Sequence, residues 1–294
     1  MKTILVIGST GQLGTSLLGV SGNNARLIGI SHQDCDVSDI DTLSSIIHKY
    51  NPYVIINTTA YHNLQLCETS PKKAFQVNAI AVGELAKLCK ANKINFITIS
   101  TDYVFDGKKK TPYIESDVPN PIQVYGASKY TGELLSRYIY PGGTYVIRTC
   151  GLYGGLEGSH QKGGNFILNI LKESKHKKIV YVNNSQRVNP TYAPHLATAI
   201  IKLINTRCDP EIYHLANENF CSWYEFSKYI FQIFNITTQL ERSTLNFSQS
   251  EFTRPKFTVL KNTKGKKVHI VLPHWKIGLI EYKKYLETNN VQTH

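Results

Sequence analysis

The sequence predicts an α/β protein with a doubly wound parallel sheet of the Rossmann type and a smaller α/β C-terminal lobe. Three observations point to this fold. A glycine-rich turn follows the first apolar run, the first 150 residues alternate between the strand and the helix period, and this rhythm loosens after about residue 150. The 294 residues are enough for one large domain with a smaller lobe. We therefore expect a first domain over residues 1–150 and a lobe over residues 151–294, with some later segments returning to the first domain.

The first half of the chain supplies the predicted strands and the helices that join them. Short apolar runs predict strands at Thr3–Ile7, Arg26–Ile30, Tyr53–Asn57, Asn95–Ser100 and Thr144–Arg148. Segments with helical spacing lie among them, at Gln12–Val20, Ile40–Lys49, Pro71–Ala91 and Pro121–Tyr140. Right-handed crossovers place the carboxyl ends of parallel strands on one edge of the sheet, so we expect ligands to bind there.

The second half of the chain has a weaker pattern. The stretch GLYGGLEGSHQKGGNF at residues 151–166 is rich in glycine and predicts a mobile loop. Helices are expected at Phe166–Glu173, Pro194–Asn205 and Ser222–Phe234, with short strands at Ile179–Val182 and Glu211–Leu215. Residues 235–274 show no clear period. We expect this half to close over the carboxyl edge of the sheet.

Composition places the chain among ordinary globular proteins and argues against several classes. Hydrophobic residues make up 41% of the chain and charged residues 18%. No apolar run is long enough to span a membrane, and the N-terminal residues do not resemble a signal peptide. The six cysteines form no C-x-x-C pair, which argues against a zinc site and favours the reducing cytoplasm.

The net charge of +12 raises the question of an anionic partner. The basic clusters are short: KKK at 108–110, KHKK at 175–178 and KNTKGKK at 261–267. Solvated loops explain them more simply than nucleic-acid binding does. A positive field that attracts a phosphorylated small substrate is the alternative. We therefore expect no nucleic-acid partner.

The stretch VIGSTGQLG is the first that points to a ligand. Gly8, Gly11 and Gly14 follow a predicted strand and open a predicted helix. Glycines at this point let the backbone turn tightly and approach a pyrophosphate, and the helix N-terminus offers free N–H groups. Tight packing of helix on strand is the alternative for an isolated glycine triplet. Because this triplet lies within a repeated β-α-β pattern, we expect residues 1–150 to bind NAD(P) and residues 151–294 mainly to bind substrate.

The end of the second predicted strand bears on which dinucleotide binds. An acidic residue there accepts the ribose 2′-hydroxyl of NAD. This chain has Ile30, Ser31, His32 and Gln33 in turn, and no acid before Asp34. Ser31 and His32 are candidate donors to a 2′-phosphate, although His32 is also typical of a solvated loop. The pattern favours NADPH over NADH.

The stretch VYGASKYTGE holds Tyr125 and Lys129, which share one helix face at i and i+4. An ammonium group near a phenol favours the phenolate and lowers the pKa of the tyrosine. Such a tyrosine can exchange a proton with a carbonyl or an alcohol. Alone, the pair would be typical of a surface helix. It lies just after the loop of the fourth strand, at the edge where ligands are expected.

The stretch STDYVFDG at residues 100–107 places a hydroxyl, a carboxylate and a phenol where the fourth strand ends. Together with the motifs above, it resembles the extended short-chain dehydrogenases/reductases, and within them the dTDP-4-dehydrorhamnose reductase group. The matching stretches are GSTGQLG, DCDVSD, INTTAYHNLQLCE, STDYVFDG, VYGASKYTGE, VIRTCGLYG, GGNF and NPTYAPHLA. They run in family order from residue 2 to about residue 200.

This resemblance implies a catalytic trio of Thr101, Tyr125 and Lys129. Tyr125 would protonate the C4 keto oxygen of a nucleotide-linked 4-keto-6-deoxyhexose, Thr101 would hydrogen-bond that oxygen, and Lys129 would bind the nicotinamide ribose. The cofactor, NADPH or NADH, would contact Gly8, Thr10, Gly11, Gln12, Leu13, Gly14, Ser31, His32, Asp36, Val37, Thr59, Ala60 and Tyr61, besides Tyr125 and Lys129. The substrate would contact Asp102, Tyr103, Val104, Gly151, Asn165 and Arg187.

Departures from the family pattern refine these expectations. Related 4,6-dehydratases carry an Asp-Glu pair after the threonine, and Asp102-Tyr103 here argues for carbonyl reduction. The reductases usually carry a tryptophan at Gly151 and an acid at Ser185, so the exact sugar and base stay open. Tyr153 and the loop from Gly154 to Gly164 are the nearest candidates in sequence to fill the gap at Gly151.

Assembly and alternative functions are less constrained by the sequence. Some relatives dimerise around magnesium, but the first helix here carries Thr15 and Ser16 and no acid, so we expect no metal. A homodimer remains compatible with the resemblance. The alternatives to a reductase are an epimerase or a bifunctional 3,5-epimerase/4-reductase, and a regulatory subunit like the β subunit of methionine adenosyltransferase. The intact trio favours an enzyme.

Overall fold

A parallel six-stranded sheet forms the centre of the protein in the computed structural model, which describes residues 2–20, 25–156, 164–243 and 253–289. The strand order is β10-β5-β4-β3-β1-β2, and every neighbouring pair is parallel. The strands are β1 (Lys2–Ile7), β2 (Ala25–Ile30), β3 (Val54–Asn57), β4 (Asn95–Thr101), β5 (Thr144–Thr149) and β10 (Ile212–His214). The predicted doubly wound sheet is confirmed, and five of its strands agree with their predicted bounds to within one or two residues.

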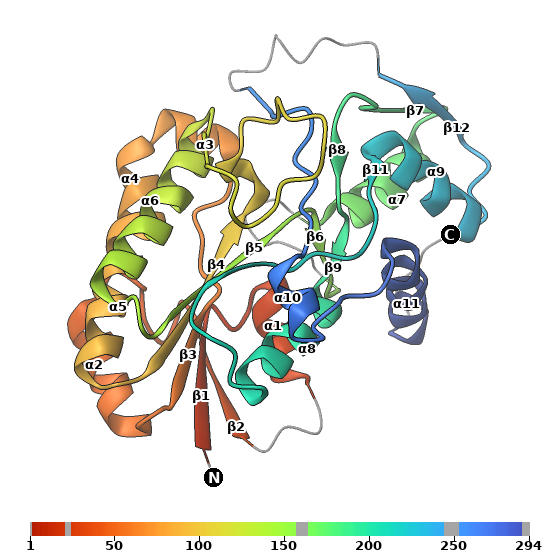
Figure 1. The fold of residues 1–294 in the computed structure, drawn as a ribbon. Helices are drawn as coiled ribbons and strands as arrows, with labels where there is room; N and C mark the ends of the chain where they lie inside the picture. Colours follow the sequence, from red (N-terminus) through yellow and green to blue (C-terminus); the bar gives the residue numbers. More distant parts are fainter. Residues whose placement is uncertain (1, 21–24, 157–163, 244–252, 290–294) are drawn as a thin grey trace.

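Helices cover both faces of the sheet (Figure 1). On one face lie α1 (Gln12–Leu18) and α8 (Ala193–Asn205), and on the other α2 (Ile40–Tyr50), α5 (Ala81–Ala91) and α6 (Val124–Ile139). Strand β1 shows why two layers form. Ile4 and Val6 enter the core beneath α1 and α8, whereas Leu5 and Ile7 enter the core beneath α2 and α5. Alternate side chains of a strand point to opposite faces, so an uninterrupted apolar strand needs cover on both sides.

The segment between β3 and β4 is divided into more helical pieces than its sequence predicts. It contains α3 (Leu64–Thr69), which was not predicted, then α4 (Pro71–Phe75), the π-helical turn η1 (Gln76–Ile80) and α5. The predicted helix Pro71–Ala91 thus contains a wide turn at its centre. Helix α6 packs closely on this turn, because a Cβ at Gly132 would lie 2.2 Å from the carbonyl oxygen of Asn78.

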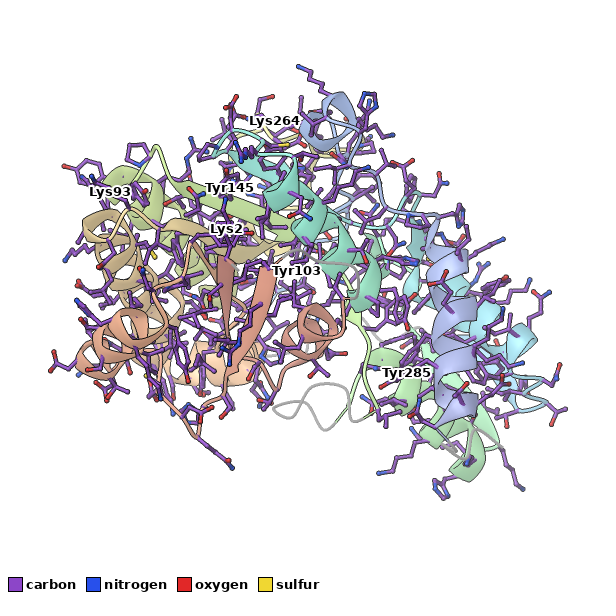
Figure 2. All side chains as sticks on the ribbon, turned by 90° about the horizontal axis from the view of Figure 1, so that it is seen from below. Lys2, Lys93, Tyr103, Tyr145, Lys264 and Tyr285 are labelled. Carbon is purple, nitrogen blue, oxygen red and sulfur yellow. The ribbon has the colours of Figure 1, made fainter. Side chains whose placement is uncertain are left out.

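A second core lies beside the carboxyl edge of the sheet. Its elements are β6 (Leu152–Tyr153), α7 (Phe166–His176), β7 (Ile179–Val182), β9 (Thr191–Tyr192), β11 (Cys221–Ser222), α9 (Trp223–Ile233), β12 (Gln239–Arg242) and α11 (Trp275–Thr288). Strand β8 (Arg187–Val188) pairs with β11, and α10 (Lys264–Lys267) lies beside β10 of the main sheet. Helices α7, α9 and α11 enclose an aromatic core that includes Tyr153, Phe226, Trp275 and Tyr282. Figure 2 shows Tyr103 between the sheet and the side of the molecule that carries α11 and Tyr285.

Some elements of the second half differ from the prediction. The strand predicted at Glu211–Leu215 exists as β10, but it pairs with β5 and extends the main sheet. The short η2 turn (Asp102–Val104), β12, α10 and α11 were not predicted. In the part of the chain that the structure describes, no helix is long and apolar enough to cross a membrane.

Candidate active site

A cleft of about 1300 Å³ opens at the carboxyl edge of the sheet, between the sheet and the second core. The glycine turn after β1 and the ends of β2, β3, β4 and β5 form one wall. The facing wall comes from α7, β7 and the start of α9. The cleft therefore lies where the parallel topology was expected to place a ligand.

The turn after β1 brings backbone close to the cleft. Gly8 has a φ of 83°, a conformation that disfavours other residues, and a Cβ at Gly14 would lie 2.2 Å from the carbonyl oxygen of Gly8. This close approach directs the N-terminus of α1 into the cleft. Thr10, Gly11, Gln12 and Leu13 line the cleft with Gly8, whereas Gly14 packs behind the turn. The cradle fits the pyrophosphate of a dinucleotide.

The end of β2 holds an acid that the sequence pattern did not place there. Asp34 Oδ2 accepts hydrogen bonds from the backbone N–H of Ser31 at 2.8 Å and from its hydroxyl at 2.6 Å. Both donor groups of Ser31, a residue predicted to bind a 2′-phosphate, are therefore engaged by a carboxylate. His32 Nδ1 lies 3.8 Å from Asp36 Oδ2, and Lys73 of α4 reaches the same part of the cleft.

The end of β3 is fixed by two buried asparagines. Asn57 Oδ1 accepts from the N–H of Thr59 at 3.1 Å and from its hydroxyl at 2.7 Å. Asn78 Oδ1 accepts from the N–H of Tyr61 at 2.8 Å, and Asn78 Nδ2 donates to Ser128 Oγ on α6 at 3.0 Å. The cleft wall from Thr59 to Tyr61, predicted to contact the cofactor, is thereby tied to the helix that carries Tyr125.

Thr101, Tyr125 and Lys129 all line the cleft. Helix α6 begins after Gln123, whose side chain caps it, and its first turn packs tightly on η2. A Cβ at Gly126 would lie 2.1 Å from the carbonyl oxygen of Tyr103, so only glycine allows this contact. The rings of Tyr103 and Tyr125 meet edge to face with their centroids 6.2 Å apart. The packing thus sets Tyr125 beside the end of β4.

Burial is the main cause of the pKa shifts of Tyr125 and Lys129. Burial lowers the pKa of Lys129 to about 8, and the nearby Glu133 charge opposes that change. Burial, followed by the charge of Asp102, raises the pKa of Tyr125 above its ordinary value. The expectation that Lys129 lowers the pKa of Tyr125 is therefore wrong for this structure. The phenol stays protonated at neutral pH and suits a proton donor.

The residues predicted to contact substrate do not all lie at the cleft surface. Asp102, Tyr103, Gly151 and Asn165 line it. Val104 instead is fully buried in a separate apolar cluster, because it follows the turn of η2 inward. Arg187 lies outside the lining, where its Nη1 donates to the carbonyl oxygen of Asn184 at 2.8 Å.

Asn165 is engaged within the protein. Its Oδ1 accepts from the N–H of Leu168 and caps α7, and its Nδ2 donates to the hydroxyl of Tyr282 at 2.8 Å. The amide therefore fixes the start of α7 at the cleft. The neighbouring residues 157–163, seven of the sixteen in the predicted mobile loop, lie outside the described residues.

Several cleft residues were not found from the sequence, among them Lys73, Gln186, Trp223 and Arg254. Trp223 begins α9, and its indole Cη2 would lie 3.4 Å from a Cβ at Gly151. Its ring packs on Phe166 with a centroid separation of 4.5 Å. The side chain beside Gly151 is thus Trp223, from 72 positions later in the chain. Tyr153, predicted for that place, is 1% exposed and belongs mainly to the aromatic core.

Comparison with known proteins identifies a matching family and several relatives. The family model described as RmlD substrate binding domain matches residues 1–287. The spore coat polysaccharide biosynthesis protein SpsK of Bacillus subtilis is 32% identical over 96% of this chain and 97% of its own length. A dTDP-4-dehydrorhamnose reductase of Aggregatibacter actinomycetemcomitans is 33% identical over 79% of each chain.

Solved structures are similar along nearly the whole chain. A dTDP-4-dehydrorhamnose reductase of Clostridium acetobutylicum has a TM-score of 0.90 and 30% identity, covering 97% of this chain and 99% of its own. The dTDP-4-dehydrorhamnose reductase of Bacillus anthracis, solved in complex with NADP, has a TM-score of 0.90 and 28% identity, covering 97% of this chain and 100% of its own. Both share the fold in which the cleft lies.

Proposed function

The chain belongs to the family of the RmlD substrate binding domain, and on that basis we propose that it is an NAD(P)H-dependent reductase of a nucleotide-linked 4-keto-6-deoxyhexose. Such a reduction is a step of deoxysugar and rhamnose biosynthesis. The observation that carries the proposal is the meeting of Thr101, Tyr125 and Lys129 with the glycine turn in one cleft. A similar reductase structure contains NADP.

The residues of the cleft divide into cofactor binding and proton supply. Backbone N–H groups of Thr10, Gln12 and Leu13 would hold the cofactor pyrophosphate at the start of α1, since those of Gly8 and Gly11 donate within the protein. The cofactor, when bound, supplies the hydride. Lys129 would bind the nicotinamide ribose, while Thr101 and Tyr125 would hold the keto oxygen. Tyr125 then donates its phenolic proton to that oxygen as the alcohol forms.

The protonation states support reduction over dehydration. Removal of water needs an added acid and base beside the threonine, and this chain offers Asp102 and Tyr103 there. Burial raises the pKa of Tyr103 above its ordinary value, so this phenol does not act as a base near neutral pH. A single carboxylate remains, which is sufficient for plain carbonyl reduction.

The test is a screen of the purified protein with NADPH or NADH and a panel of nucleotide-linked 4-keto-6-deoxyhexoses, followed by NMR of the products. A reductase consumes one cofactor per product alcohol. An epimerised product without net cofactor consumption would contradict the proposal in favour of an epimerase. Cofactor binding without turnover on any member of the panel would favour a regulatory subunit.

We also propose that the enzyme works in the cytoplasm without a metal, as a homodimer. All six cysteines lie in the described part of the chain and carry free thiols, which suits a reducing compartment. Helix α1 has no acidic residue in its first turn. Dialysis against EDTA should leave activity unchanged, and sedimentation velocity should give the mass of two chains. Loss of activity that magnesium restores would overturn the metal-free assignment.

A further inference from the structure

A buried charged cluster continues the face of α6 that carries Tyr125 and Lys129. It consists of Glu133, Arg148 and Ser100, which are 3%, 1% and 4% exposed. Arg148 donates to Glu133 from Nε, at 3.0 and 3.2 Å to the two carboxylate oxygens, and from Nη2 at 2.6 Å. The hydroxyl of Ser100 donates to Glu133 Oε1 as well. The carboxylate is therefore bound from two strands at once.

The cluster joins α6 and β4, the two elements that hold the trio, to the neighbouring strand β5. On α6, Glu133 follows Lys129 by four residues and Tyr125 by eight, so the three share one helix face. Ser100 directly precedes Thr101 on β4 and is paired in register with Arg148 on β5. Through Glu133, the helix with the phenol and the ammonium is fixed against the strand end with the hydroxyl.

Stability alone is a weak explanation for this cluster. Two charges removed from water cost several kcal/mol each, and well-packed apolar side chains of similar volume are often as stable or more so. Lys129 provides another explanation. It is 4% exposed, burial disfavours its ammonium form, and the Glu133 charge is the opposing influence.

We propose that Glu133 is a positioning residue, which keeps Lys129 charged and holds the Tyr125–Lys129 face of α6 in register with Thr101. Its part in turnover rests on the proposed function, whereas its effect on Lys129 does not. Arg148 and Ser100 hold the carboxylate against the sheet, so that it cannot turn away from β4 and β5.

The other charged and titratable groups near the cluster allow this role. Arg148 partly cancels the Glu133 charge from the β5 side. His214 of β10 lies 3.4 Å from Arg148 Nη1, and burial lowers its pKa to about 4, so it is neutral near pH 7. On the cleft side, Lys129 shares the site with Tyr125 and Asp102. The charge that opposes burial at the Lys129 ammonium is that of Glu133, one turn further along the same helix.

The test measures Lys129 directly, without substrate or cofactor. Trace labelling with acetic anhydride between pH 6 and 10, followed by mass spectrometry of the peptide that contains Lys129, gives the pH midpoint of its amine. Glu133→Gln should lower this midpoint by about one unit or more, the usual effect of losing a nearby opposite charge. Glu84→Gln is the matched control, because it breaks the exposed pair with Lys87 on α5 and should leave the midpoint unchanged.

A second variant covers the case in which Glu133→Gln leaves Arg148 uncompensated and does not fold. The double substitution Glu133→Leu with Arg148→Met removes both charges, and it should fold and still lower the midpoint, though by less. A folded variant with the wild-type midpoint would overturn the proposal and leave the cluster a purely structural role. Activity on the sugar panel is scored separately, so a shifted midpoint without reductase activity contradicts only the proposed function.

Discussion

The hydroxyl of Thr101 donates a hydrogen bond to Asp102 Oδ1 at 3.1 Å and accepts one from the N–H of Tyr103 at 3.2 Å. Its single proton is thus directed toward a carboxylate that is 4% exposed. Burial raises the pKa of Asp102 from 3.8 to about 6, against the opposing effect of the nearby Thr258, Cys150 and Thr101 side chains. An ionisable group in this position links the stability of the fold to its catalysis.

Asp102→Asn should stabilise the protein at pH 7. The pKa of Asp102 is higher in the folded than in the unfolded chain, so stability is fully present below about pH 4 and falls as pH rises toward about 6. A shift of this size corresponds to about 3 kcal/mol. Urea unfolding at pH 7 should show a free energy of unfolding that is higher by about this amount in Asp102→Asn than in the wild type. The difference should vanish near pH 4.

The control variant for this prediction, Asp106→Asn, should change the free energy of unfolding in the opposite direction. Asp106 is half-buried and accepts a hydrogen bond from the N–H of Lys108, which together with Tyr113 and Asn120 holds its pKa below the ordinary value. The contribution of ionised Asp106 to stability is present above the pKa that this group has in the unfolded chain, and it is lost as pH falls below that value. Asp106→Asn should therefore destabilise the protein slightly at pH 7. Equal stability of Asp102→Asn and wild type at pH 7 would contradict the first prediction.

The same carboxyl should appear in the pH dependence of catalysis. Ionised Asp102 holds the Thr101 proton, whereas protonated Asp102 releases it to the keto oxygen of the substrate. We expect kcat/KM for reduction to rise as pH falls through about 6, and the step to be absent in Asp102→Asn. A step of unchanged midpoint in the variant would assign it to another group.

Tyr125→Phe should lower turnover by roughly a hundredfold or more, the usual contribution of a positioned proton donor. The ring and its contact with Tyr103 remain, so NADPH affinity should be nearly unchanged. Stopped-flow single turnovers separate the chemical step from product release. Tyr138→Phe is the matched control on the same helix, because Tyr138 is 87% exposed and its loss should have no effect. Most of the wild-type rate in Tyr125→Phe would refute the assigned mechanism.

The bond between Ser31 and Asp34 predicts how the cofactor preference can be changed. The Asp34 carboxylate accepts hydrogen bonds from the N–H and the hydroxyl of Ser31. It also places a negative charge where a 2′-phosphate would bind. Asp34→Ala should therefore raise NADPH affinity roughly tenfold or more, the scale of a hydrogen bond to a charged group, and leave NADH affinity unchanged or lower. Isothermal titration with both cofactors measures it, with Asp41→Ala as a nearby acidic control. Unchanged NADPH affinity would place the phosphate elsewhere, with Lys73 the next candidate.

The parts of the fold that could be predicted are those with a strong local pattern. Strands such as β1 are apolar on both faces, and the glycine turn follows the first of them, so the doubly wound sheet follows from spacing alone. Helix α11 was missed because Ile277 and Ile280 are exposed and obscure its apolar stripe. Strand β10 was predicted, but its pairing with β5 was not, because three residues do not specify their partner strand.

The candidate site divides in the same way. Tyr125 and Lys129 could be paired from the sequence because four residues span one helical turn. Trp223 and Arg254 reach the cleft only through the packing of distant segments, and no local signal identifies them. The pKa of Tyr125 was predicted with the wrong sign, since its partial burial and the approach of Asp102 depend on tertiary structure.

Gly151 and Trp223 together predict where the sugar-facing wall lies. Gly151 has a φ of 55°, and a Cβ there would lie 3.1 Å from the carbonyl oxygen of Asn189 and 3.2 Å from Cα of Pro190. A tryptophan at this position would be strained and crowded. We therefore expect Gly151→Trp to destabilise the protein, and it is a poor test of the substrate pocket. Trp223 offers the better one.

Trp223→Ala should weaken the sugar nucleotide without affecting the cofactor. The indole lies beside Gly151 and on Phe166, on the wall that faces the cofactor turn, so its face can stack on a flat ligand ring. A stacked aromatic contact contributes about 0.5–1.5 kcal/mol, which corresponds to a rise in substrate KM of about two- to tenfold. Tyr224→Ala is the matched control, since Tyr224 follows Trp223 on α9 and contacts Arg242 outside the cleft lining. Steady-state kinetics and NADPH titration of both variants measure the effect. If substrate KM stays at the wild-type value in Trp223→Ala while the fold is intact, the sugar nucleotide binds away from Trp223, in the part of the cleft that β7 lines.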